Sequence, residues 1–204
     1  MLVEDLENQK KFRKILEIPY TDLIPFVFEY LKKNTSLIMF FVFACIASLT
    51  MAVSIRIDIS GYFRPYEIVS HSILGFIVLP ILIIPVHELL HIIPYYIAGA
   101  KKIRVGMDLK QYLFYVTAHR HVAGPSQFRI VAVLPFIIIS LISLFLIFYL
   151  PGLWKWSISL FLFVHTTMCA GDFALLNFYT VNRDKKIYTW DDADEKIAYF
   201  YEEV

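Results

Sequence analysis

The sequence predicts an all-α membrane protein, a bundle of four transmembrane helices with a short β-like loop on one side. Two observations indicate this fold class. Of the 204 residues, 58% are hydrophobic and 18% are charged, whereas soluble domains contain about 45–50% apolar and about 25% charged residues. The apolar residues also gather in four runs, each long enough for the roughly 20 residues that a membrane helix needs. A soluble enzyme, a disulfide-rich secreted domain and a disordered chain are therefore disfavoured.

Four helices are expected because every backbone N–H and C=O must be paired internally in hydrocarbon. The first covers residues 36–55, the second about 70–98, the third about 130–150 and the fourth about 153–180. Only a short turn containing Pro151 and Gly152 separates the last two. We therefore expect the third and fourth helices to form an antiparallel hairpin.

The distribution of Lys and Arg predicts the orientation of these spans. With four spans, the N-terminal arm, the loop 99–129 and the C-terminal tail share one side, and they hold 16 of the 19 basic residues. The other side holds only Arg56, Arg64 and Lys155. Positive charge favours the cytoplasmic side, so both termini should face the cytoplasm. The net charge of +1 hides this asymmetry and offers no basic surface for nucleic acid.

Three parts follow from this topology: a cytoplasmic N-terminal arm (1–35), the four-helix transmembrane domain (36–180) and a cytoplasmic acidic tail (181–204). The arm contains an apolar stretch at 23–31. It could lie on the membrane surface as an amphipathic helix, or it could be an ordinary connecting helix.

The loop and the tail lack the helical pattern. Apolar and polar residues alternate over 103–116, which predicts one or two short strands. The acidic end, residues 191–204, is expected to be a solvated helix or disordered.

The second expected helix contains the sequence His87-Glu88-Leu89-Leu90-His91. This is the H-E-x-x-H pattern of zinc peptidases. Residues four apart share a helix face, so both histidines can present a ring nitrogen to one metal ion. Glu88 can then take a proton from metal-bound water. The alternative is a structural His/Glu cluster, although three polar residues inside a membrane span are costly.

Asp172 is the candidate third metal ligand. Zinc hydrolases usually have three protein ligands and one position for water. His91 precedes Lys101 by ten residues and Asp172 precedes Arg183 by eleven, in helices expected to run in the same direction. Both groups should therefore lie about 15 Å from the cytoplasmic boundary. Ala170 and Gly171 beside Asp172 would allow another helix to approach closely. Alternatively, Asp172 belongs to a hydrogen-bond network between helices.

The remaining histidines have weaker assignments. His165 lies seven residues before Asp172, on the same helix face. It could steady Asp172, polarise a substrate carbonyl or replace a ligand, and it could equally be a packing residue. His119 and His121 are expected in a solvated basic loop, and His71 is expected at the outer end, far from the motif.

The motif at 87–91 in one span, with Asp172 in a later one, resembles the site-2-protease type of intramembrane zinc metalloprotease. More closely, the chain resembles the zincin peptidase family of small bacterial integral membrane proteins grouped under a domain of unknown function. The resemblance implies that His87, His91 and Asp172 bind zinc and that Glu88 is the catalytic base. It also implies that a strand region, here 103–116, holds the substrate extended.

The sequence departs from the site-2 pattern in two places. That pattern has a glycine after the ligand aspartate, whereas here Gly171 precedes Asp172 and Phe173 follows it. The chain also has no room for a PDZ-type domain that filters substrates.

The leading hypothesis is a zinc-dependent intramembrane or membrane-proximal endopeptidase of the bacterial cytoplasmic membrane, acting on a membrane protein or peptide. The expected partners are that substrate and the lipid bilayer, with no nucleic acid. One alternative is a non-catalytic membrane scaffold with a structural metal site. A metal or ion transporter is the third hypothesis, because buried acidic and histidine groups also mark transport paths.

Overall fold

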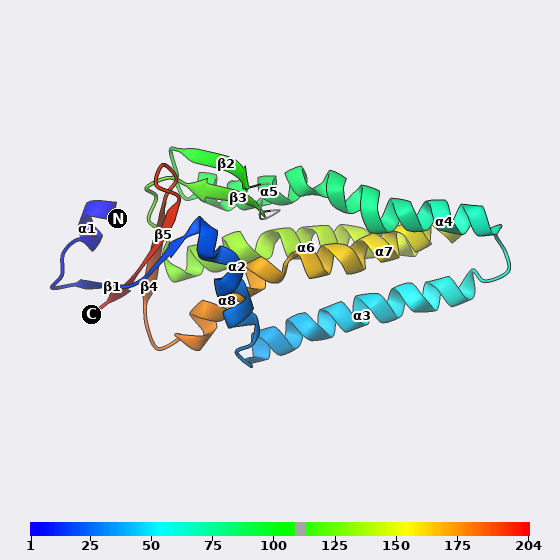
Figure 1. Cartoon of the computed structure of the whole chain (residues 1–204), viewed down its shortest axis with the longest axis horizontal. Coiled ribbons are helices and arrows are strands. Elements are labelled where there is room, and N and C mark those ends of the chain that lie inside the picture. The colour runs from blue at the N-terminus through cyan, green and yellow to red at the C-terminus, as the bar shows by residue number, and fades with distance from the viewer. Residues whose placement is uncertain (109–112) are drawn as a thin grey trace.

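The computed structural model describes residues 1–108 and 113–204 as a bundle of long helices with strands gathered at one end (Figure 1). The helices are α1 (Val3–Leu6), η1 (Tyr20–Asp22, 3-10), α2 (Leu23–Leu31), α3 (Ser36–Asp58), α4 (Pro65–Ile73), η2 (Leu74–Val78, π-helical), α5 (Leu79–Ile97), α6 (Pro125–Tyr149), α7 (Gly152–Met168) and α8 (Ala170–Val181). The strands are β1 (Phe12–Pro19), β2 (Ile103–Asp108), β3 (Leu113–Ala118), β4 (Ile187–Asp192) and β5 (Ile197–Glu203).

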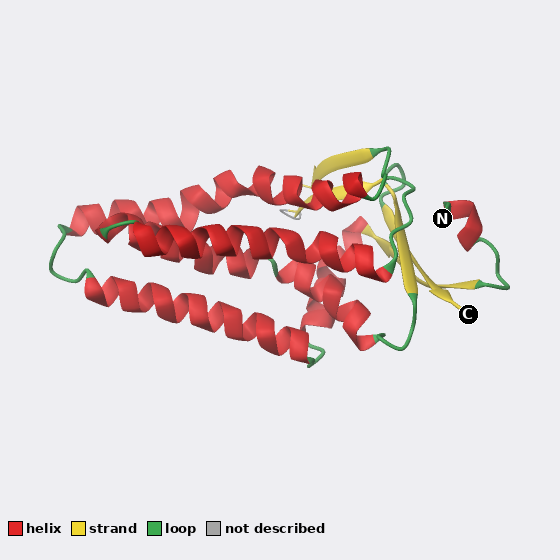
Figure 2. Cartoon of the chain, turned by 180° about the vertical axis from the view of Figure 1, so that it is seen from behind, coloured by secondary structure: helices red, strands yellow, loops and turns green. Residues whose placement is uncertain are grey.

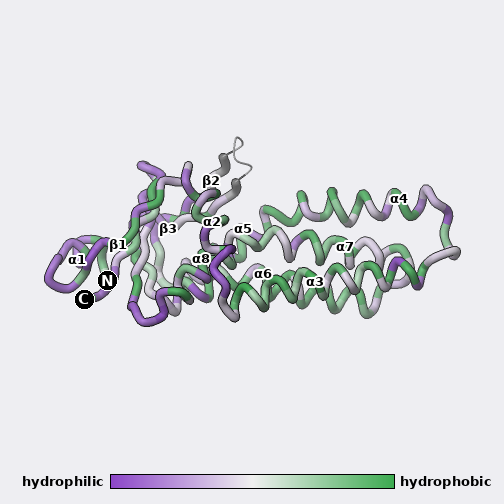
Figure 3. Tube along the Cα trace, turned by 60° about the horizontal axis from the view of Figure 1, so that its bottom comes forward, coloured by the Kyte–Doolittle hydropathy of each residue, from purple (hydrophilic) through white to green (hydrophobic). Residues whose placement is uncertain are grey.

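Three helical segments are long and apolar enough to cross a membrane. They are α3, the continuous segment α4–η2–α5 (Pro65–Ile97) and α6. The helices α7 and α8 qualify only together, with a bend of 42° between them, so the structure supports three spans or four. Hydrophobic residues follow the long helices, whereas hydrophilic residues gather at the strand end (Figure 3). The chain thus has the helices of an integral membrane protein.

The predicted fourth helix is broken rather than continuous. Cys169 adopts φ −72° and ψ 5°, outside the α-helical region, between the end of α7 and the start of α8. The break places Asp172 in the first turn of α8, where the N-terminal end of the helix favours a negative charge.

The predicted second helix contains a π-helical turn. This turn, η2, ends two residues before Pro80, whose ring would clash with the carbonyl of residue 76 in a regular α-helix. Within the turn, Gly75 lies directly against the backbone of Ser157 on α7, where an added Cβ would collide. A Cβ at Gly171 would meet nothing within 4 Å. The close helix approach expected at Gly171 is therefore found at Gly75 instead.

The sequence predicted an all-α fold, but the structure contains two small antiparallel sheets at one end of the helical bundle. β1, β5 and β4 form a three-stranded antiparallel sheet in that order, and β2 pairs with β3. The tail is thus a strand hairpin, and the expectation of a helix or disorder was wrong. Its alternation of buried Ile187 and Thr189 with more exposed neighbours suits a half-buried sheet. The pair β2–β3 agrees with the strands expected over 103–116.

The arm and the tail pack together over the end of the helices, where both termini also lie (Figure 2). One apolar core joins Ile18 of β1, Phe26 of α2, Phe178 of α8 and Phe200 of β5. Two isolated β-bridges, His119 with Asp191 and Ala123 with Thr189, also connect β4 to the segment after β3. The shared core thereby fixes the three-stranded sheet against α2, α6 and α8.

Candidate metal centre

Two histidines of α5 form the first half of the candidate site. His87 and His91 are both buried, and their Nε2 atoms lie 3.2 Å apart. The separation of four residues in a helix brings them onto one face, as the sequence predicts. Both rings can therefore direct a nitrogen toward a common point.

Asp172 of α8 completes a three-sided arrangement. Its Oδ2 lies 3.4 Å from His87 Nε2, and its Oδ1 lies 3.5 Å from His91 Nε2. Ligand atoms at about 2.0–2.1 Å from a tetrahedral zinc ion are roughly 3.3 Å from one another. The spacing and the donor set, two imidazoles and a carboxylate, thus fit zinc. The structure brings together the three residues that the sequence nominated as ligands.

Hydrogen bonds on the far side of each ring orient the two histidines. His91 Nδ1 lies 2.9 Å from the carbonyl oxygen of Val131 on α6 and donates to it, because a carbonyl only accepts. His87 Nδ1 lies 3.2 Å from Nε2 of His165 on α7. When His87 donates this hydrogen bond, both histidines keep a free Nε2 lone pair. Such outer contacts are typical of metal-ligating histidines.

His165 is fully buried and contacts His87 rather than the space beside the ligands. Its Nδ1 has no hydrogen-bond partner among the described residues. Cys169 Sγ lies 3.9 Å from His165 Nε2, and the cysteine side chain is otherwise packed among apolar residues. His165 thus lies behind His87, and the ligand atoms of His87, His165 and Cys169 are also close enough to one another to hold an ion.

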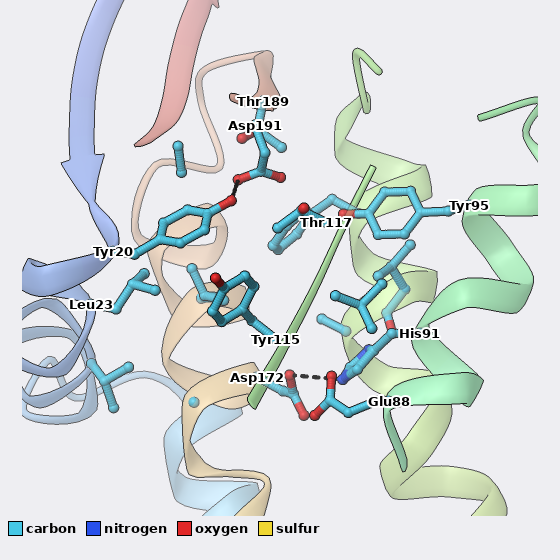
Figure 4. Close-up of a pocket in the computed structure, with 18 of the residues that line it drawn as sticks. Tyr20, Leu23, Glu88, His91, Tyr95, Tyr115, Thr117, Asp172, Thr189 and Asp191 are labelled. Carbon is cyan, nitrogen blue, oxygen red and sulfur yellow. Dashed lines mark hydrogen bonds and ion pairs between the residues drawn. The ribbon is translucent and has the colours of Figure 1, made fainter. Parts of the chain in front are cut away.

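Glu88 lies beside the three candidate ligand residues. It is partly buried, and its carboxylate is close enough to His87 and His91 for the three to share an ion. Figure 4 shows the carboxylates of Glu88 and Asp172 at the same end of a cavity. Glu88 therefore has access both to the ligand cluster and to the space where a substrate could enter.

The cavity has a volume of about 240 Å³ and extends from Glu88 and Asp172 to the three-stranded sheet. Asp191 of β4 and Tyr20 of η1 line its far end (Figure 4). Burial raises the pKa of the Asp191 carboxyl to about 7 and also raises the pKa of the Tyr20 hydroxyl. Tyr115 of β3 forms part of the wall between the two ends.

Sequence reasoning missed Asp191 and Tyr20. Both belong to segments that were assigned to a solvated tail and arm, far from the motif in the chain. The alternation at Ile187 and Thr189 could have indicated a strand there. Only tertiary structure shows that this strand faces the motif.

The other histidines lie away from the ligand cluster. His119 is not solvated, since its side chain is 8% exposed and its Nδ1 accepts a hydrogen bond from the N–H of Ala193. His121 is half-buried beside Gln127, and burial lowers the pKa of its imidazole. The expectation of a solvated loop was therefore wrong for His119. His71 contacts Ser157 between α4 and α7.

A family model described as "Putative zincin peptidase" matches residues 80–187, more than half of the 204-residue chain. The match includes His87, Glu88, His91 and Asp172. No curated protein and no solved structure matches the chain. The family description implies a zinc cofactor and peptide-bond hydrolysis. The chain therefore belongs to this zincin peptidase family, and it is a zinc metallopeptidase.

Proposed function

We propose that this metallopeptidase is an endopeptidase that cleaves peptide bonds within the membrane or beside its cytoplasmic face. One observation carries the proposal: the Nε2 atoms of His87 and His91 lie 3.2 Å apart, and each lies 3.4–3.5 Å from one of the two carboxylate oxygens of Asp172. The neighbouring Glu88 supplies the carboxylate that hydrolysis needs. His87, His91 and Asp172 are the zinc ligands in this proposal.

The chemistry follows from the position of Glu88. His87, His91 and Asp172 would hold the zinc ion, which would supply Lewis-acid polarisation of a water molecule. Glu88 would accept a proton from the attacking water as the water oxygen adds to the peptide carbonyl. Glu88 then donates the proton to the amine as the C–N bond breaks. The products are a carboxylate and an amine, and no other reactant is needed.

His165 acts as a positioning residue in this proposal. Its Nε2 accepts a hydrogen bond from His87 Nδ1–H, which fixes the His87 tautomer and leaves Nε2 free for zinc. A contribution to substrate polarisation is disfavoured because the side chain is fully buried behind His87.

The proposed topology has four spans, with α7 and α8 forming one bent span. The positive-inside rule then places both termini and the strand end in the cytoplasm of a bacterial cell. His91 lies six residues before the end of α5 at Ile97, or about 9 Å along the axis. Cleavage would thus occur near the cytoplasmic boundary, as in the site-2 proteases that the motif resembles.

The substrate in this proposal is a membrane protein or a peptide at the membrane surface. β3 pairs with β2 along one edge, and its residues 115–117 line the cavity. An extended substrate could add to the β2–β3 pair through main-chain hydrogen bonds. Its scissile bond would then lie beside Glu88.

The test is cleavage of membrane-peptide libraries by the purified chain in proteoliposomes. Glu88→Gln should lower cleavage by about 10²–10⁴-fold while zinc content stays unchanged. Glu29→Gln is the matched control, because Glu29 is exposed on α2 and pairs with Lys33. Wild-type cleavage by zinc-loaded Glu88→Gln would reject Glu88 as the base. Zinc flux into the liposomes without cleavage would favour a transporter.

A further inference from the structure

Asp191 is a carboxylate without a cationic partner at the far end of the cavity. No Lys, Arg or His of the described residues forms an ion pair with it. Among the described residues, its one side-chain hydrogen bond is a long one of 3.5 Å, donated by the Tyr20 hydroxyl to Oδ1. Asp191 is half-buried, and a largely desolvated carboxylate that lacks a positive partner is costly. It therefore requires an explanation.

The walls beside Asp191 are aromatic. The rings of Tyr20 and Tyr115 contact each other edge to face, with centroids 4.8 Å apart, and Tyr95 lines the opposite side. The Thr117 hydroxyl also lines the cavity, is buried and has no hydrogen-bond partner of standard geometry among the described residues. The cavity thus combines apolar ring surfaces with hydroxyl and carboxylate oxygens at one end (Figure 4).

This combination suits a lysine or arginine side chain. The aliphatic stem of such a residue packs on apolar surface, while the charged end seeks a carboxylate or an aromatic face. Burial keeps the pKa of Asp191 near 7, and a cation beside it would favour the ionised form. The titratable groups that face Asp191 from neighbouring elements are the hydroxyls of Tyr20, Tyr95 and Tyr179, none of which is cationic.

The dimensions agree with this occupant. Tyr95 follows His91 by one turn of α5, which is about 6 Å along the helix axis. An extended lysine side chain reaches about 6 Å from Cα to Nζ. A substrate backbone near Glu88 could therefore direct a basic side chain past Tyr115 toward Asp191.

We propose that the cavity is a specificity pocket for a lysine or arginine side chain of the substrate, with Asp191 as its charge partner. This rests on the proposed endopeptidase function. The family match ends at residue 187 and covers neither Asp191 nor Tyr20. The pocket is thus built by adding the arm and the tail to the region that carries the metal ligands.

The test compares two capped peptides, acetyl-Ala-Ala-Lys-Ala-Ala-amide and the same peptide with norleucine in place of lysine. Their dissociation constants are measured with the full-length, zinc-loaded Glu88→Gln variant in nanodiscs. This variant is used because its cleavage of the peptides should be too slow to disturb the binding measurement. We expect the lysine peptide to bind at least about tenfold more tightly. Asp191→Asn in that background should abolish the difference and leave norleucine binding unchanged.

Asp194→Asn is the matched control, because Asp194 is exposed and pairs with Arg104. It should keep the lysine preference, and the zinc content of all variants reports that they are folded. Equal affinities for the two peptides, or a preference that survives Asp191→Asn, would overturn the proposal. A third peptide carries norleucine and a free amino terminus. If it binds as tightly as the lysine peptide, the pocket recognises a terminal amine, and the side-chain assignment is overturned.

The same measurement separates this proposal from the endopeptidase proposal. Zinc content and the loss of cleavage in Glu88→Gln do not depend on Asp191. An active, zinc-loaded enzyme without lysine preference would reject the pocket alone. An enzyme without zinc or cleavage would reject the endopeptidase proposal first.

Discussion

At the scale of single residues, the proposed positioning role of His165 can be tested through zinc affinity. Its Nε2 lies 3.2 Å from His87 Nδ1, so it can select the tautomer in which His87 Nε2 carries the lone pair. His165→Ala should weaken zinc binding by about 10–100-fold. His165→Gln should restore part of the affinity, because its side-chain carbonyl can accept the same hydrogen bond.

Zinc competition with a chelator measures this effect. Ser143→Ala serves as a control for general loosening of the bundle, because Ser143 is a buried α6 residue whose hydroxyl donates a hydrogen bond to the Ile139 carbonyl of the same helix. A zinc affinity that is unchanged in His165→Ala would contradict the positioning role.

Asp191 makes a prediction about the pH dependence of stability. Its pKa rises from 3.8 to about 7 on folding, so the folded chain holds this proton more tightly than the unfolded chain. The free energy of unfolding should therefore fall as the pH rises from about 4 to 7. Asp191→Asn removes this loss and should be more stable than wild type by about 1–3 kcal/mol at pH 8.

Thermal unfolding in detergent at pH 4.5 and pH 8 checks this expectation. The gain in Asp191→Asn should shrink to about a quarter of its size at the lower pH, because that pH lies only slightly above the unfolded pKa of 3.8. Parallel pH profiles for the two proteins would contradict a buried, partnerless carboxyl.

The ligand cluster could be anticipated residue by residue, whereas the cavity beyond it could not. The spacing of His87 and His91 and the depth of Asp172 are properties of single helices, and helical geometry relates them directly. Asp191 reaches the cavity only because β4 pairs with β5 and bridges to the segment after β3. Such long-range pairing leaves no local pattern that would locate the residue.

At the scale of elements, the π-helical turn η2 fixes the contact between the second span and α7. Gly75 lies against the backbone of Ser157, which cannot move aside cheaply. Gly75→Ala should therefore lower the free energy of unfolding by about 1–3 kcal/mol through overpacking. Unfolding in a denaturing detergent measures the change.

Gly171→Ala is the matched control for this substitution. A Cβ at Gly171 meets no atom within 4 Å, so alanine should leave stability unchanged or raise it by up to about 1 kcal/mol through helix propensity. Equal effects of the two substitutions would contradict the packing assigned to Gly75.

The elements most poorly predicted were those in which tertiary contacts outweigh local composition. The acidic residues at 191–204 suggested solvent exposure, yet β5 buries Ala198 and Phe200. The bend at Cys169 was also missed, since the residues around it continue the apolar run. By contrast, α3 and α6 follow long uncharged or nearly uncharged runs, whose length alone identifies membrane helices.

At the scale of the whole molecule, the proposed topology places the sheet and both termini in the cytoplasm. Fusions of the full chain to green fluorescent protein at its C-terminus should fluoresce, whereas alkaline phosphatase inserted after Tyr62 should be active. The physical reason is the concentration of Lys and Arg on the strand side. An active phosphatase at the C-terminus would contradict four spans in this orientation.

The sheet built from the arm and the tail makes the molecule one unit rather than a helical domain with free ends. β1 and β5 pair along most of their length, from Phe12 with Glu203 to Pro19 with Ile197. Through this pairing, the sheet forms the end of the cavity opposite the candidate metal ligands. The overall class of apolar helices was predictable from composition, but the pairing of β1 with β5 joins residues 178–191 positions apart.

In the proposed site, His87, His91 and Asp172 bind one zinc ion. The most direct measurement is zinc content together with zinc X-ray absorption of the purified full-length chain. We predict one zinc per chain in wild type and Glu88→Gln, with two imidazole nitrogens at about 2.0–2.1 Å, and loss of zinc in His91→Ala. Absence of zinc from the wild type, or stoichiometric zinc in both His91→Ala and Asp172→Ala, would contradict the claim.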